Sequence, residues 1–143
     1  MMDLKQFAAM LERGIAETVP AIEIGLDKVG TLAQTIAAEL PGHYQPGWAP
    51  LAESTLKDKE AKGFPVPSPL KRTGEMAGSY KKELDLAELA VVVGSDEPKA
   101  LWQEMGTSRI PPRPVLAPAM SRSLPYAGDV FGEIAVKLLT GRK

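Results

Sequence analysis

Few residues in this 143-residue chain have the types and spacing that catalysis or metal binding requires. The chain has no cysteine, which excludes disulfides, thiolate metal sites and cysteine nucleophiles. Its one histidine, His43, lies in a proline-rich stretch, without a second histidine to share a metal or a serine elbow to activate. An ordinary loop side chain is therefore the simplest interpretation of His43.

Carboxylate pairs are the other candidates for chemistry. Asp58 with Glu60, or Asp96 with Glu97, could do general acid–base work. Charged residues make up 24% of the chain, however, and nearby carboxylates in such a sequence usually form solvated surface. The glycines have neither the spacing of a phosphate loop nor that of a dinucleotide fingerprint. We therefore expect no enzyme and no cofactor, and a hydrolase using paired carboxylates is the weakest alternative.

The nearly equal numbers of basic and acidic residues do not indicate a particular kind of partner. The chain has 17 lysines and arginines against 18 aspartates and glutamates, whereas a protein that grips nucleic acid over its whole surface should be clearly basic. The basic residues form a modest cluster with acidic residues interleaved: Lys57, Lys59, Lys62, Lys71, Arg72, Lys81 and Lys82. One alternative function is thus a nucleic-acid-associated accessory protein, in which Lys71, Arg72, Lys81 and Lys82 contact phosphate.

The length and the 44% of hydrophobic residues are typical of one folded domain. The patterns run in the order helices, long loop, hairpin, helices, which predicts an α+β fold with a small antiparallel sheet. We expect one domain over 1–143, with a helical part at 1–40, a loop-rich segment at 41–69, and the sheet and C-terminal helices at 70–143. The chain lacks a signal-like apolar start and any run of about 18 apolar residues, so we expect it in the cytoplasm without a membrane span.

Apolar residues at three- and four-residue steps predict helix through the first 40 residues. Pro20 should either split this part into helices at 2–19 and 20–40 or bend one long helix. Residues 41–69 hold six prolines and one short stretch, 51–62, that can be helical. Such a long loop could be a plain surface loop or a segment that becomes ordered against a partner.

The spacing of apolar residues is no longer helical in residues 76–94, where a run of β-branched residues ending at Gly94 predicts a β-hairpin. Its edge could extend the sheet of a neighbouring subunit. Next we expect a helix over 98–105, with Asp96 as its cap and Gly106 at its end. Residues 110–114 must be extended because of their prolines. Two further helices are expected at 115–123 and 126–139.

Three segments, in this order, resemble the motifs of phage virion-morphogenesis and tail-completion proteins, which include lambda-like minor tail protein Z. The first, over 48–55, is similar to "W-x-P-L-x-x-x-T" and the second, over 69–79, to "P-L-x-x-T-G-x-L-x-x-S". The third, over 104–119, is similar to "E-x-G-T" followed by "P-x-R-P-F-L-x-P-A". Met76 replaces the usual leucine and Val115 the aromatic residue. The residues that we single out are Trp48, Pro50, Leu51, Thr73, Gly74, Glu104, Gly106, Thr107, Arg113 and Pro114.

The resemblance implies a structural protein of a phage or prophage, not an enzyme. Its relatives close the end of the tail tube and join tail to head, generally as a ring of identical subunits. The implied partners are copies of the chain itself (six is one candidate number), the tail tube protein and the head connector proteins, with DNA only passing through the lumen. The implied location is the virion, after assembly in the cytoplasm of the bacterial host.

Physical roles can be expected for several of these residues. Trp48, held between prolines, could anchor its loop either on the chain's own core or on a neighbouring subunit. The hydroxyl of Thr73 could cap the turn that leads into Met76, and Gly74 could take a positive φ. Glu104 and Arg113 could form an ion pair within one subunit or between two, or remain two independently solvated charges.

Overall fold

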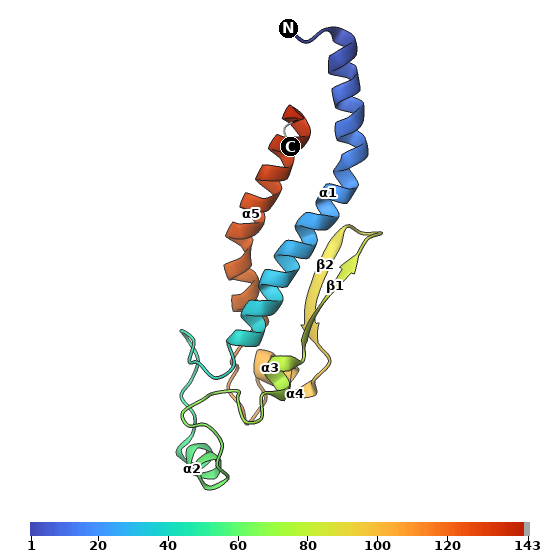
Figure 1. Cartoon of the computed structure of the whole chain (residues 1–143). Helices are drawn as coiled ribbons and strands as arrows, with labels where there is room; N and C mark the ends of the chain where they lie inside the picture. The colour runs from blue at the N-terminus through green and yellow to red at the C-terminus, as the bar shows by residue number, and fades with distance from the viewer. Residues whose placement is uncertain (142–143) are drawn as a thin grey trace.

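A computed structural model describes residues 1–141 and has the α+β class that the sequence predicts (Figure 1). Long helices form both ends of the chain, and a two-stranded antiparallel sheet comes between them in the sequence. The elements are α1 Leu4–Glu39, α2 Glu53–Ala61, α3 Glu75–Gly78, β1 Tyr80–Asp85, β2 Ala90–Ser95, α4 Pro98–Met105 and α5 Leu116–Thr140.

The first helix, α1, is one continuous helix of 36 residues with Pro20 inside it. It begins with a capping box, in which Asp3 Oδ1 accepts from the N–H of Gln6 at 2.7 Å and Gln6 Oε1 accepts from the N–H of Asp3 at 2.9 Å. Figure 1 shows its axis changing direction about halfway along, where Pro20 removes a backbone donor. Of the two alternatives, the single bent helix is correct.

The last helix, α5, corrects the prediction of two helices at 115–123 and 126–139. It runs unbroken over 25 residues with Pro125 inside it, antiparallel to α1 (Figure 1). A proline costs the helix one hydrogen bond, but packing along α1 holds the turns on both sides of it. The two helices approach closely at Gly25, where an added Cβ would lie only 2.7 Å from Phe131 Cε1 and 2.8 Å from Ile134 Cδ1.

The hairpin starts later than residue 76, because residues 76–78 belong to α3. Its register runs from Tyr80↔Ser95 to Asp85↔Ala90, which leaves residues 86–89 as the turn. One face of the hairpin packs on α1, and Gln34 Nε2 donates to the carbonyl of Tyr80 at 2.9 Å. Lys82 reaches across to pair with Asp27.

The core lies at one end of the molecule, where the end of α1 and the start of α5 meet α3, α4 and the base of the hairpin (Figure 1). It consists of Ala37, Leu40, Trp48, Met76, Tyr80, Ala100, Val115 and Ala119. The first half of α1 extends beyond this core and leaves large apolar side chains in solvent. The molecule is therefore elongated, with one anchored end and one open end.

The close approach of α1 and α5 at Gly25 makes the first prediction. Replacing Gly25→Val should lower the free energy of unfolding by about 1–3 kcal/mol, because the new side chain overlaps Phe131 and Ile134. The matched control is Gly132→Val on α5, where an added Cβ meets nothing within 4 Å. Urea unfolding of both variants should show a loss at Gly25 alone; equal midpoints would contradict the close approach.

Candidate functional site

The first and third motif segments are bound directly to each other. Trp48 is only 8% exposed, and its Nε1–H donates to the carbonyl of Pro114 at 3.1 Å. The buried Arg113 donates back from Nε to the carbonyl of Ala49 and from Nη2 to that of Pro50, each at 3.0 Å. Trp48 therefore anchors its loop on the chain's own core, which decides between the two roles that the sequence left open for it.

Glu104 caps α5 from a different helix. Its carboxylate accepts from the N–H groups of Val115 at 2.7 Å, Leu116 at 3.0 Å and Ala117 at 3.0 Å. These are among the N–H groups that a helix start leaves unpaired, and no side chain of α5's own N-cap satisfies them. A carboxylate at this end also complements the helix dipole.

The expected ion pair between Glu104 and Arg113 within the subunit is not formed. Each side chain binds backbone groups instead, Glu104 three N–H groups and Arg113 two carbonyls. Both groups are thereby hydrogen-bonded where they lie, which a buried guanidinium such as that of Arg113 requires. An ion pair between Glu104 of one subunit and Arg113 of another stays a prediction.

The glycine of the "E-x-G-T" motif ends α4 as predicted, with a φ of 74° at Gly106. Thr107 Oγ1 then accepts from the N–H groups of Arg109 at 3.2 Å and Ile110 at 3.1 Å, which closes a tight turn. This turn sends the chain back along α4 toward Arg113. The expected Asp96 cap is wrong, because Glu97 occupies the N-cap position and makes no side-chain cap bond.

Gly74 takes a φ of 93° at the start of α3, as the sequence predicts. The hydroxyl of Thr73 accepts from the N–H of Glu75 at 3.4 Å, which is at the long limit of a hydrogen bond. Glycine's backbone freedom, more than the hydroxyl, accounts for this turn.

Contacts within the chain hold the loop-rich segment 41–69, which contains α2. Its two ends meet where the N–H of Gly42 donates to the carbonyl of Pro69 at 2.7 Å. Lys59, on α2, is only 3% exposed, and its Nζ donates to the carbonyls of Ser68 and Lys71. Burial lowers the pKa of Lys59, and the cation of Arg72 lowers it further. The sequence placed Lys59 in a solvated charged run, and no local pattern marks it as buried.

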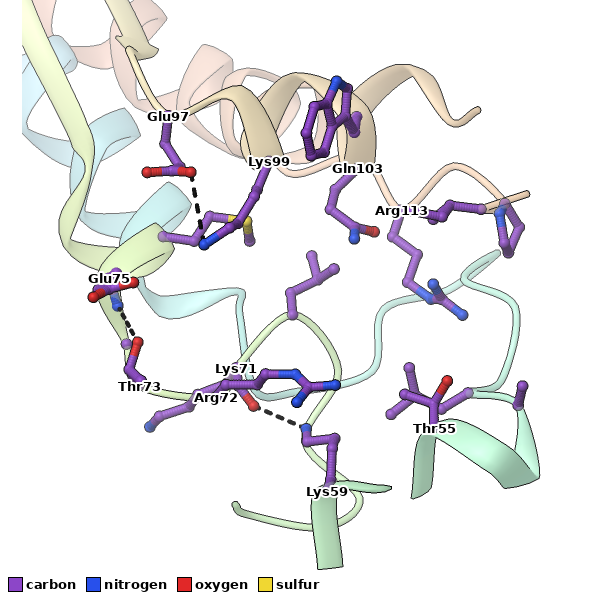
Figure 2. A pocket seen from close by; sticks show the side chains of 18 of the residues that line it. Thr55, Lys59, Lys71, Arg72, Thr73, Glu75, Glu97, Lys99, Gln103 and Arg113 are labelled. Atoms are coloured by element: carbon purple, nitrogen blue, oxygen red, sulfur yellow. Dashed lines mark hydrogen bonds and ion pairs between the residues drawn. The ribbon is translucent and has the colours of Figure 1, made fainter. Parts of the chain in front are cut away.

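All three motif segments border one groove of about 570 Å³ (Figure 2). Its walls come from residues 50–59, residues 70–76, α4 and residues 109–113. Of the ten residues singled out from the sequence, Pro50, Leu51, Thr73, Gly74 and Arg113 line it. The others, Trp48, Glu104, Gly106, Thr107 and Pro114, shape it through the hydrogen bonds and turns described above.

Cations and apolar side chains dominate the groove. Six cationic side chains line it against two carboxylates, Glu75 and Glu97, and Figure 2 shows most of them around one hollow. The six are Lys59, Lys71, Arg72, Lys99, Arg109 and Arg113. Apolar contact surface comes from Leu51, Leu70, Met76, Trp102 and Ile110. Such a surface suits binding of a segment that carries both carboxylates and apolar side chains.

Not all of these cations are available for a ligand. Arg72 pairs with Asp58 at 2.9 Å and lies 5.2 Å from the centre of the Phe64 ring. Hydrogen bonds from Lys62 and Arg72 lower the pKa of the Asp58 carboxyl. Lys71 and Arg109 have no carboxylate within 4.0 Å among residues 1–141.

Of the remaining candidates from the sequence, Glu97 alone lines this groove. His43 is exposed, and Glu60 and Asp96 are absent from the groove lining. Within the described part of the chain no three Asp, Glu or His side chains gather as metal ligands would. In the same part, no helix combines the length and the apolarity needed to cross a bilayer. Comparisons with protein-family models, curated proteins and solved structures found no match to this chain.

The capping role of Glu104 makes the second prediction. Glu104→Gln should lower the free energy of unfolding by about 1–3 kcal/mol, because it removes the charge from three hydrogen bonds. Exchanging the charges, with Glu104→Arg and Arg113→Glu in one chain, should not restore stability. A restored midpoint in chemical unfolding would show that the two side chains do form an ion pair. Glu75→Gln, an exposed carboxylate on the same groove, is the control.

Tyr80 makes the third prediction. Its burial raises its pKa to about 12, and the nearby Glu104 carboxylate adds to the rise. Between the ordinary tyrosine pKa of about 10 and the raised value, the folded state keeps a proton that the unfolded chain loses. The free energy of unfolding should therefore fall as the pH rises from 10 to 12.

Tyr80→Phe should flatten this pH dependence, whatever it costs in absolute stability. Thermal unfolding at a series of pH values measures it, and Tyr126→Phe, which changes an exposed ring on α5, is the control. An unchanged slope in Tyr80→Phe would contradict the prediction.

Proposed function

We propose that this chain is a structural protein of a phage or prophage, which completes the end of the tail and joins it to the head by assembling as a ring. The observation that carries the proposal is its large surface. The chain exposes 9687 Å², whereas a compact monomer of 15.3 kDa should expose roughly 7,100 Å². The excess is more than the ~1,600 Å² that two ordinary interfaces of ~800 Å² would cover on one subunit.

The uncovered surface is apolar in two separate places. On the first half of α1 a stripe at helical spacing is exposed: Leu4 (83%), Phe7 (45%), Leu11 (43%), Ile15 (75%) and Val19 (47%). Near the other end, α4 exposes Leu101, Trp102 and Met105. Contiguous exposed apolar surface marks interaction sites. Two separate exposed surfaces allow each subunit to contact more than one neighbour, as every subunit of a ring must.

The sequence resemblance adds the biological setting. Its three motifs, which lie apart in sequence, border one groove, and the first and third are hydrogen-bonded to each other. In this role the partners are further copies of the chain, the tail tube protein and the head connector proteins, and DNA passes through the lumen. The protein resides in the virion and performs no catalytic step. The free edges of the hairpin are a further surface that a neighbour could use.

The alternative of DNA binding has less support. It rested on Lys71, Arg72, Lys81 and Lys82, but three of these four pair with carboxylates: Arg72 with Asp58, Lys81 with Asp96 and Lys82 with Asp27. Phosphate contacts would have to compete with these pairs.

The decisive experiment deletes the gene from its parent phage or prophage. Electron microscopy should then show filled heads beside unjoined or wrongly terminated tails. Normal, infectious particles would overturn the proposed function and bring the nucleic-acid alternative forward.

Complementation of that deletion tests the exposed stripe and is the fourth prediction. Ile15→Glu, supplied in trans, should fold but fail to restore joined particles, because it puts a charge into the apolar contact. Ala16→Glu places the same charge on the neighbouring exposed position and should restore them. Equal rescue by both variants would exclude the stripe as an interface.

A further inference from the structure

We propose that the acidic tip of one subunit's hairpin, residues 83–88, docks into the groove of the next subunit. This inference rests on the proposed function, because it names the contact by which the ring would form. The occupant is thus a second copy of this chain.

The groove offers unpaired cations and exposed apolar surface to a partner. Lys71 and Arg109 carry charges that no carboxylate in the described chain neutralises. Trp102, 49% exposed, offers a large apolar face on the same groove. Arginine and tryptophan are the side chains that most often dominate the energy of protein interfaces.

The groove also contains an acceptor without a donor. Gln103 Oε1 is buried and has no hydrogen-bond partner in the described chain. Figure 2 shows Gln103 reaching from α4 toward the hollow. Leaving such a group unpaired costs free energy, and it gains a partner only if the side chain turns toward a donor in the groove.

The hairpin tip has the complementary chemistry. Glu83, Asp85 and Glu88 place three carboxylates within six residues, and none has an ion-pair partner in residues 1–141. Between them Leu86 is 54% exposed. The tip therefore presents an apolar side chain flanked by negative charges, which matches apolar groove walls with cations on the rim.

The tip is held in shape before any contact is made. Asp85 Oδ1 accepts from the N–H groups of Ala87 and Glu88, each at 3.0 Å, which closes the turn. A segment that is already ordered loses little conformational entropy on docking. The groove volume of about 570 Å³ lies within the ~300–1,000 Å³ of ordinary binding pockets, so one turn with a leucine is a reasonable occupant.

The geometry directs this contact between subunits. In Figure 1 the tip of the hairpin points away from α2, α3 and α4, beside which the groove lies. One chain therefore cannot fill its own groove, and each subunit keeps one free tip and one free groove. Such a head-to-tail contact closes into a ring if the rotation from one subunit to the next allows it.

The absence of cysteine in the full sequence permits a direct proximity test. Full-length Leu86→Cys and full-length Lys71→Cys, mixed under mild oxidation, should form a disulfide-linked dimer. Ala16→Cys mixed with Lys71→Cys is the control and should form none above background. Equal yields in the two mixtures would overturn the proposal.

Charge reversal tests the same contact by affinity. The tip variant Glu83→Lys with Glu88→Lys leaves Asp85 to hold the turn, and the groove variant is Lys71→Glu with Arg109→Glu. Each should weaken self-association by at least about tenfold in low-salt sedimentation experiments. A mixture of the two should recover self-association, since the intact tip meets the intact groove and the reversed tip is again opposite in charge to the reversed groove. Self-association unchanged in both variants would overturn the proposal.

Complementation separates this inference from the proposed function. Both charge-reversal variants should fail to restore joined particles. If the deletion blocks joining but both variants restore it, this contact is wrong and the joining function stands. Failure of the groove variant alone would also overturn it, because the groove would then bind another virion protein or, if Lys71 and Arg109 support a salt-dependent DNA gel shift, DNA.

Discussion

The carboxylate of Glu104 accepts the first free N–H groups of α5, and the arrangement of the anchored end depends on this contact. Because α5 starts without a cap of its own, its first turn would otherwise leave buried donors unpaired. Because Glu104 ties the first turn of α5 to α4, it also fixes the path of the extended segment before α5, residues 110–114. Arg113 and Pro114 are thereby held against the Trp48 loop, and the wall of the groove follows.

The same contact explains why one small core can hold so elongated a chain. The buried residues gather around Val115, which donates to Glu104, and Tyr80, whose pKa the Glu104 charge helps to raise. Away from this end, α1 packs on α5 and on the hairpin. Close approach at glycines such as Gly25 compensates for the few buried side chains there, since helices that pack closely gain more dispersion contacts.

The sequence predicts best what is decided locally. The helical first 40 residues, the hairpin, the end of α4 at Gly106 and the positive φ of Gly74 all follow from periodicity or from backbone freedom. Whether Pro20 splits or bends the first helix did not follow from them. Prediction from the sequence failed for features that depend on contacts with other parts of the chain. The continuity of α5 through Pro125 depends on α1, and the burial of Lys59 depends on two carbonyls from residues 68 and 71. Five of the ten residues singled out from the motifs line the groove, but Arg109 was not among them, because its place on the groove forms only after folding.

The near-zero net charge conceals a separation of charge along the molecule. The carboxylates of the hairpin tip and the cations of the groove lie on different parts of an elongated chain, while some other charges pair locally, as Lys82 does with Asp27. In the proposed ring, the unpaired charges at these two sites help to orient copies of the chain as they approach. A monomer gains nothing from such polarity. In a ring it sets the direction in which subunits follow one another, because tip against tip and groove against groove both repel.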